Sequence, residues 1–215
     1  MSWEFYDQYG SLKSTDPTGK GVIYSDTAPL RKDVIWVDTG TSGLIPVVTS
    51  LPGNPYDGQT VVYRPVADVA WTFMYNGAGG TYKWEFIGGG TVRAGTATGV
   101  SQGNSGGVMV APSTQLSIAI PFAGVYEVEI GSGMAYCSVV GVGGAIGFSG
   151  PGFATGFNSE NVARADGNTA QGVSTTVTVT ATASGNLVSL TGTGGATTLT
   201  LPYGYHMTMK PIRVG

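Results

Sequence analysis

The sequence predicts an all-β protein. Its 215 residues include 36 glycines and 11 prolines, which favour turns, together with many Thr, Ser and Val residues, which favour strands. Apolar and polar residues alternate with a period of two over much of the C-terminal half, as in strands that bury one face. The length allows one ordinary core plus a smaller module. We expect four parts, residues 1–48, 49–92, 93–107 and 108–215.

Residues 1–48 hold several aromatic side chains but little else from which to build a core. The aromatic residues are Trp3, Phe5, Tyr6, Tyr24 and Trp36. They are too many for a free, solvated tail and too few for a self-contained domain. We therefore interpret this part as an attachment segment that docks on another protein, with Trp3, Phe5, Tyr6 and Trp36 as the candidate docking residues.

Residues 49–92 predict a small β-module. They begin with "LPGNPYDGQTVVYRP", in which Pro-Gly, Asn-Pro and Asp-Gly are strong turn signals. Two aromatic-rich runs then flank a glycine-rich turn in "VAWTFMYNGAGGTYKWEF", the pattern of a β-hairpin. So small a hairpin needs large side chains to bury any surface, so we interpret its aromatic residues as a miniature core completed by neighbouring subunits. The residues concerned are Trp71, Tyr75, Tyr82 and Trp84. The alternative is that their flat rings bind a sugar or a partner chain.

Residues 93–107 and 108–215 differ sharply in pattern. The first, "RAGTATGVSQGNSGG", lacks periodicity and has the composition of a flexible linker. In the second, "LSIAIPFAGVYEVEIGSG" holds two alternating runs around a Pro–Gly corner and implies two antiparallel strands. "TTVTVTATASGNLVSLTGTGGATTLTLP" repeats this pattern. About seven or eight short strands separated by turns predict a β-sandwich or jelly roll.

Composition argues against several classes of function. Charged residues make up only 11% of the chain and the net charge is −3, so we expect no nucleic-acid binding. Glycine, serine and threonine interrupt every apolar stretch well before the length of a membrane span, and no signal-peptide pattern opens the sequence, so we expect no membrane insertion. One cysteine, Cys137, allows no internal disulfide and is expected to be a small buried strand residue.

Catalytic and metal sites are also not expected. Glu127 and Glu129 would lie about 6.5–7 Å apart on one strand face, a spacing that glycosidases use. Their alternation with buried residues is, however, what an exposed strand face requires, and we interpret them as solvated. His206 is the only histidine, which excludes a multi-histidine metal site, so we expect it to be satisfied by a neighbour or by a subunit interface. We predict no enzymatic activity and no cofactor.

Several stretches together resemble minor structural proteins of tailed bacteriophages, namely short tail fibres, tail-tip adhesins and head fibres. They are "SWEFYDQYGSLKS", "DVIWVDTG", "DGQTVVYRPV", "WTFMYN", "YKWEFIGGG", "FAGVYEVEIGS" and the closing "PIRV". The resemblance implies a C-terminal jelly roll similar to the C1q/TNF-like heads. It also implies a homotrimeric virion component that binds other virion proteins through its N-terminal segment and displays its C-terminal head.

We expect the trimer to form through the surfaces of "YEVEI", "TVTVTATA" and the last strand. Residues 147–172 form the longest stretch of the head without strand alternation, and such loops often carry binding residues. A host-surface glycan or protein could therefore contact this loop. The alternative is a loop that covers the core or a trimer interface. The candidate host-binding residues are Phe153, Phe157, Asn158, Asn161 and Arg164.

Three functions remain open from sequence. The first is a short spike or tail-fibre adhesin that contacts the host surface. The second is a non-adhesive virion component, such as a head fibre, a capsid decoration protein or a tail-tip connector. The third is a polysaccharide-degrading enzyme or a non-viral lectin, but the chain has only 13 acidic residues from which to build a hydrolytic cleft.

Overall fold

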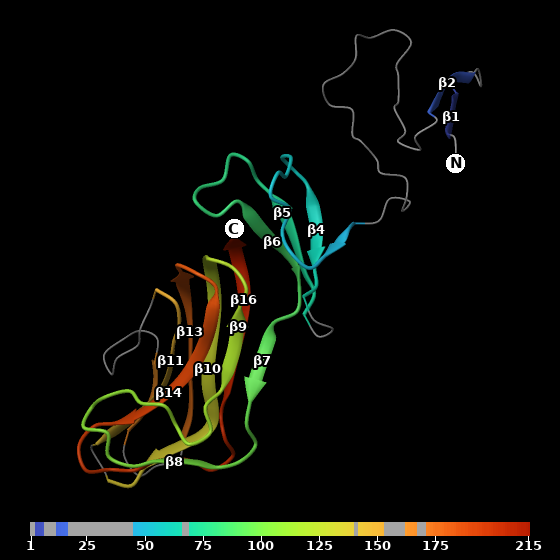
Figure 1. The fold of residues 1–215 in the computed structure, drawn as a ribbon. Coiled ribbons are helices and arrows are strands. Elements are labelled where there is room, and N and C mark those ends of the chain that lie inside the picture. The colour runs from blue at the N-terminus through green and yellow to red at the C-terminus, as the bar shows by residue number, and fades with distance from the viewer. Residues whose placement is uncertain are drawn as a thin grey trace. The chain divides into compact units, whose positions relative to one another are not determined.

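The computed structural model describes residues 3–6, 12–16, 45–65, 69–139, 142–152, 162–166 and 171–215. The chain divides into two compact units, residues 1–46 and 47–215. All regular secondary structure in the described residues is β-strand (Figure 1). The all-β prediction is confirmed.

The N-terminal unit contains one short antiparallel hairpin. Strand β1 (Trp3–Tyr6) pairs with β2 (Leu12–Asp16). The candidate docking residues Trp3, Phe5 and Tyr6 belong to β1, and Trp36 lies outside the described residues. Their role in attachment stays a prediction.

The second unit begins with the predicted β-module. Its strands are β3 (Val47–Val48), β4 (Thr60–Tyr63), β5 (Trp71–Tyr75) and β6 (Trp84–Gly89). β3 runs parallel to β4, whereas β4, β5 and β6 are antiparallel neighbours. Tyr75 lies opposite Trp84 in the β5–β6 pair, so the predicted hairpin is confirmed.

The aromatic residues of the module form its core. Four of them are buried, namely Tyr63, Trp71, Phe73 and Trp84. The ring centroids of Tyr63 and of Phe122, in the sandwich that follows, are 4.8 Å apart. Of the four residues expected in the miniature core, Trp71 and Trp84 are buried, whereas Tyr75 and Tyr82 are half-buried. The chain's own sandwich packs against this core, because the last strand of the sandwich runs beside β6. Completion of the core by neighbouring subunits stays a prediction.

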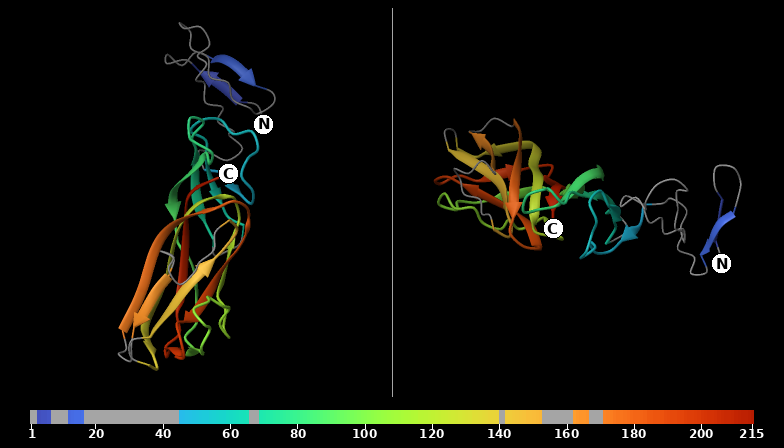
Figure 2. Two further views of the ribbon diagram at one scale, coloured as in Figure 1. Left: turned by 90° about the vertical axis from the view of Figure 1, so that its left-hand side faces the viewer. Right: turned by 90° about the horizontal axis from the view of Figure 1, so that it is seen from above.

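The C-terminal part is a β-sandwich, and the described residues of 108–215 form eight strands. They are β9 (Ser117–Ile120), β10 (Gly124–Cys137), β11 (Gly143–Ser149), β12 (Val162–Asp166), β13 (Gln171–Ala181), β14 (Gly185–Thr193), β15 (Leu199–Leu201) and β16 (His206–Val214). One sheet has the order β12-β11-β14-β9. In the other sheet β10 lies between β13 and β16, and further strands extend it (Figure 2). This architecture is consistent with the expected jelly roll.

The two strands predicted around the Pro–Gly corner belong to opposite sheets. β9 pairs with β14, whereas β10 pairs with β13 and β16. The chain crosses between sheets again from β13 to β14. Each strand therefore turns its apolar face toward the other sheet, and the core forms between Ile118 and Ile120 on one side and Tyr126, Val128 and Ile130 on the other.

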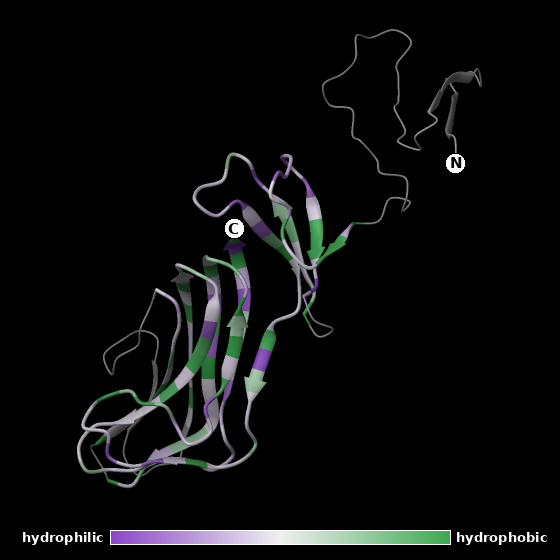
Figure 3. Cartoon of the chain, in the orientation of Figure 1, coloured by the Kyte–Doolittle hydropathy of each residue, from purple (hydrophilic) through white to green (hydrophobic). Residues whose placement is uncertain are grey.

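The prediction that residues 93–107 form a flexible linker is wrong in part. Val92–Gly95 forms β7, which pairs with β16, and Val100–Gln102 forms β8, which pairs with β15. Figure 3 shows one hydrophilic band between two apolar bands on β7. Two or three small apolar residues at alternate positions are enough to form these short strands. The edge of an existing sheet supplies the hydrogen-bond partners of their backbone.

The loop predicted for residues 147–172 is also shorter than expected. Gly147–Ser149 completes β11, Val162–Asp166 forms β12 beside it, and Gln171 opens β13. Phe148, which the sequence placed in this loop, is fully buried in the core. The strand was not recognised from sequence because its small residues Gly144, Ala145 and Gly147 do not show the usual alternation of apolar and polar residues.

Candidate functional site

The described residues contain no helix long and apolar enough to cross a membrane. They also hold no group of three or more His, Cys, Asp or Glu side chains placed to share a metal ion. Two cavities in the described part of the chain are candidate sites, both within the unit of residues 47–215.

The first cavity opens beside β10, where two neighbouring lines of strand are interrupted at the same level. β15 and β16 both run along one edge of β10, but the first pairing ends at Tyr136–Thr200 and the second begins at Gly131–His206. β8 and β7 follow β15 and β16 in the same way and are separated by residues 96–99. The missing pairs leave a cavity of about 420 Å³.

A tight turn closes this cavity at the edge formed by residues 201–204. The amide of Gly204 donates a hydrogen bond to the carbonyl of Leu201 at 3.0 Å. Pro202 follows Leu201 and Gly204 ends the turn, the residue preferences of a type I β-turn. Gly204 has a φ of +75°, and a Cβ built there would meet the carbonyl oxygen of Thr96. The turn therefore holds Tyr203 on a fixed backbone, and the residue is 73% exposed.

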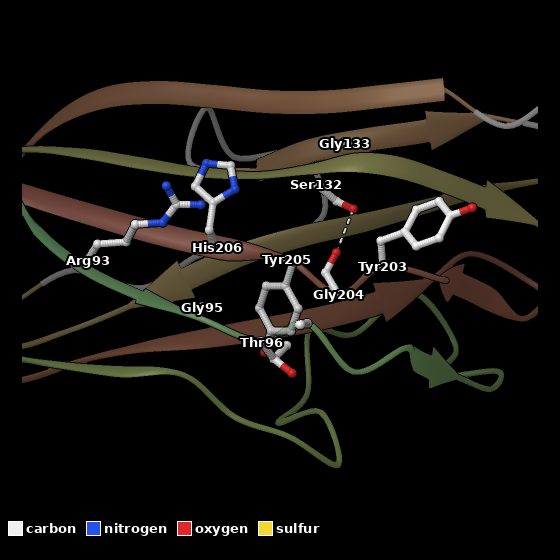
Figure 4. Close-up of a pocket in the computed structure, with 10 residues that line it drawn as sticks. Arg93, Gly95, Thr96, Ser132, Gly133, Tyr203, Gly204, Tyr205 and His206 are labelled. Atoms are coloured by element: carbon white, nitrogen blue, oxygen red, sulfur yellow. Dashed lines mark hydrogen bonds between the residues drawn. The ribbon is translucent and has the colours of Figure 1, made fainter.

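The floor of the cavity is a set of backbone groups connected by Ser132. Its hydroxyl lies 2.8 Å from the carbonyl oxygens of Met134 and Gly204 and donates its one proton to either. It also accepts a hydrogen bond from the amide of Met134 at 3.3 Å. Figure 4 shows this connection in the middle of the cavity, with Arg93 and His206 at one end and Tyr203 at the other.

Of the basic residues near the cavity, His206 and Lys210 lie beside acidic side chains that the structure describes and Arg93 does not. His206 Nε2 lies 3.5 Å from Glu129 Oε1, and Lys210 Nζ lies 2.8 Å from Glu127 Oε1. Among side chains that the structure describes, no carboxylate forms an ion pair with Arg93. Arg93 therefore contributes the one uncompensated charge to the cavity lining.

Ser132 and His206, a hydroxyl and an imidazole among the described residues of this cavity, do not form an activated nucleophile–base pair. Ser132 lies two residues after the inward-facing Ile130 and therefore also faces inward. His206 lies next to the inward-facing Met207 and therefore faces outward. Their side chains thus point to opposite faces of the sheet, and Ser132 is only 4% exposed. Within the described residues, the chemistry available at this cavity is binding through hydrogen bonds, one positive charge and one exposed aromatic ring.

Buried polar side chains lie beneath the cavity. The Tyr205 hydroxyl donates to the carbonyl of Thr114 at 2.7 Å and lies 2.7 Å from Ser189 Oγ, which accepts from the amide of Leu116. Burial raises the pKa of Tyr205 above its ordinary value, and the hydrogen bond with Ser189 opposes this effect. The phenol therefore stays neutral and connects the two sheets below the turn.

The second cavity, of about 430 Å³, lies between the β-module and the sandwich. Tyr75, Trp84 and Phe122 supply aromatic surface, and Lys83 supplies a charge. The rings of Tyr75 and Trp84 pack edge to face with centroids 5.3 Å apart, and Trp84 is 3% exposed. These rings are therefore used largely to hold the module against the sandwich.

The candidate residues from sequence are only partly located by the structure. Phe153, Phe157, Asn158 and Asn161 lie outside the described residues, and Arg164 belongs to β12, opposite Ala145. Their contact with a host surface stays a prediction.

Three other residues singled out from sequence have clear surroundings. Glu127 and Glu129, expected to be solvated, lie on a polar sheet face with side chains 40% exposed, each beside a basic side chain. Cys137 is fully buried and forms no disulfide, as expected.

Sequence reasoning missed Arg93 and Tyr203. Arg93 lay in the expected linker, although Val92 and Ala94 alternate around it. The turn signature "LPYG" was present around Tyr203, but only the fold brings it beside residues 93–97.

No protein-family model matches the chain, and a search of the curated proteins found no match.

Proposed function

We propose that the chain is a bacteriophage virion protein that acts by binding: a short, trimeric spike or tail fibre that contacts the host surface. Residues 1–46 attach it to other virion proteins, and residues 47–215 form the displayed part. The sequence resemblance to tail and head fibres provides the viral assignment in this proposal.

The observation that carries the binding role is the character of the first cavity. It is open, lined mainly by polar groups and framed by the paired strands β7, β10 and β16, without a nucleophile–base pair among its described residues. Small-ligand sites commonly have volumes of about 300–1,000 Å³ and a few well-placed polar groups on a rigid frame. Such a site suits recognition of a surface molecule better than its chemical conversion.

The proposed trimer contact runs along β13 and the adjoining parts of β10 and β16. Ser174, Thr176, Thr178 and Thr180 are exposed on β13, beside the ion pair of Glu127 with Lys210. A contact on this face would be hydrogen-bonded and polar. It leaves β7 and the turn at residues 201–204 available to a ligand.

Particle localisation tests this proposal. Antibodies raised against residues 47–215 should label the tail tip of virions that carry the chain, and their Fab fragments should slow adsorption to host cells. Labelling of the capsid with normal adsorption would favour the non-adhesive head fibre or decoration protein. Particles that carry no label would contradict the proposal as a whole.

A chain that lacks residues 1–46 tests the attachment role. This variant keeps the compact unit of residues 47–215. It should accumulate as folded protein but be missing from purified particles. Incorporation at the level of the full chain would show that attachment lies elsewhere.

A further inference from the structure

We propose that the cavity between β7, β10 and the turn at residues 201–204 binds a carboxylate-bearing sugar of the uronic-acid type. Arg93 holds the carboxylate, and the ring of Tyr203 packs against the sugar. This inference rests on the proposed host-surface binding, and it adds the chemical class of the ligand and the residues that select it.

Arg93 is the anion-binding group of the site. It lies opposite Thr208 in the β7–β16 pair, while His206 lies two residues from Thr208 on the same face. His206 contacts Glu129, but Arg93 has no carboxylate partner among the described side chains. A guanidinium presents two parallel N–H groups that match the two oxygens of a carboxylate. The strand pairing with β16 fixes the backbone from which this side chain extends.

Tyr203 is the apolar contact of the site. Its ring lies at the other end of the cavity from Arg93 (Figure 4), and the residue is 73% exposed. The turn that carries it is held by the hydrogen bond from Gly204 to Leu201 and by the close approach of Thr96 to Gly204. Aromatic rings combine a large apolar face with little conformational freedom to lose on binding. The apolar face of a pyranose ring suits such a surface.

The region between these two residues offers hydrogen-bonding groups for sugar hydroxyls. The lining contains Gly95, Gly133 and the polar residue Thr96, whose hydroxyl accepts a hydrogen bond from the amide of Thr98. Gly133 is exposed, and a Cβ built there would meet no atom within 4 Å. The backbone is therefore accessible at this point, and a lining that is mainly polar disfavours an apolar ligand.

The charge of the site favours a single carboxylate over a phosphate group. Arg93 is the only cation of the described lining that is not beside an acidic side chain. Glu129 and Glu127 add negative charge to the same sheet face. One guanidinium neutralises a single carboxylate but only half the charge of a doubly charged phosphate, and these carboxylates would repel the phosphate more strongly.

Direct binding of simple sugars to the full chain tests the inference. Galacturonate, galactose and inorganic phosphate should be titrated by calorimetry and by NMR against the wild-type protein and three arginine variants. Arg93→Ala removes the charge, and Arg93→Lys keeps the charge but not the two parallel N–H groups of the guanidinium. Arg213→Ala is the control, because it removes an exposed arginine of β16 outside the cavity. All sites are on the surface, and circular dichroism confirms that each variant is folded.

We expect galacturonate to bind saturably and more tightly than galactose. Arg93→Ala should weaken galacturonate binding about tenfold or more, since hydrogen bonds to charged groups are the stronger ones. Arg93→Lys should give a smaller loss, and Arg213→Ala should match wild type. Tyr203→Ala should weaken galacturonate and galactose alike. Equal binding of galacturonate by Arg93→Ala and wild type would overturn the inference, as would phosphate bound as tightly as galacturonate.

A parallel measurement on whole host cells separates this inference from the proposed function. Wild-type protein that binds cells, with no loss in Arg93→Ala, would leave the adhesive role standing and refute the ligand assignment. Galacturonate binding without any binding to cells would support the site and contradict the adhesive role. Cell binding that is lost in Arg93→Ala and competed by galacturonate would support both.

Discussion

Single residues decide the shape of the candidate site. Gly204 is the most constrained of them, because its φ is +75° and a Cβ would meet the carbonyl oxygen of Thr96. The turn at residues 201–204 can therefore lie against residues 96–99 only with glycine at this position. Ser132 adds a second constraint from the opposite strand through its hydroxyl.

Replacement of Gly204 by alanine should destabilise the protein. Strain at a positive φ costs about 1–3 kcal/mol, and the collision with Thr96 adds to it. The measurement is the free energy of unfolding in urea. Gly103→Ala is the matched control, because Gly103 has no atom within 4 Å of a built Cβ and no positive φ, so its effect should stay within about 0.5 kcal/mol. Equal effects of the two changes would contradict the close packing of the turn.

Tyr126 should make the protein sensitive to alkali. Burial raises its pKa well above the ordinary value of 10.0, while the hydrogen bond from its hydroxyl to the carbonyl of Phe122 opposes this effect. The neutral phenol is thus favoured in the folded state. Its stabilising effect is complete below pH 10 and is lost as the pH rises toward the folded-state pKa, by about 1.4 kcal/mol per pH unit.

Tyr126→Phe tests this pH dependence. The variant should be less stable than wild type near neutral pH, because it lacks a hydrogen bond worth about 1 kcal/mol. Above pH 10 the free energies of unfolding of the two proteins should converge. If the free energies of unfolding of the two proteins stayed a constant distance apart across this pH range, the pKa of Tyr126 would not differ between the folded and unfolded states.

Elements were predictable from sequence wherever a strand alternates between large apolar and polar residues. The strand of "YEVEI" and the aromatic hairpin are the clearest cases, since both faces can be read from the residues themselves. β7 and β11 were missed for a common reason. Val92 and Ala94 in β7, and Gly144 and Gly147 in β11, are too small to give a strong pattern, and their pairing depends on neighbours far away in sequence.

Amide hydrogen exchange tests the strand assignment of the expected linker. The amides of Val92–Gly95 that donate to β16 should exchange slowly, at rates comparable with those of β16 itself. Gly53 and Asn54, which are exposed and outside any strand, should exchange quickly. If Val92–Gly95 exchanged as fast as Gly53 and Asn54, residues 93–107 would be the flexible linker that composition suggests.

The aromatic module should unfold together with the sandwich. Trp71 is buried, and its indole N–H donates to the carbonyl of Gly90 at 2.9 Å. Trp71→Ala should lower the free energy of unfolding by about 3–5 kcal/mol in a single transition, because β6 pairs with β16. Tyr56→Ala, at a side chain 64% exposed, is the control and should change it little. Two separate transitions would show that the module is energetically independent.

At the scale of the whole molecule, the sequence predicted the class of fold better than the site. The sandwich follows from strand patterns that are local. The cavity does not, because it depends on two strand lines being interrupted at one level beside β10. Residues 96–99, 132–135 and 201–205 carry no signal of their proximity. Arg93 and Tyr203 therefore could be recognised as neighbours only from the structure.

The proposed trimer makes a direct prediction about mass. Light scattering on the full chain should give three times the 22.0 kDa of one chain. Thr178→Arg, on the exposed face of β13 opposite Glu127, should lower this mass by placing a large side chain in the contact. Thr114→Arg places the same change at an exposed position outside that face and should leave the mass unchanged. A monomer at micromolar concentration would contradict the trimer.

Competition for the host surface tests the central claim most directly. Host cells are preincubated with purified full-length protein, and the adsorption rate of the phage that carries this chain is then measured. The account predicts that adsorption slows in proportion to the occupied surface, and that Arg93→Ala protein competes less well than Arg213→Ala protein. Normal adsorption at protein concentrations that saturate the cells, or no binding of the protein to the cells at all, would contradict it.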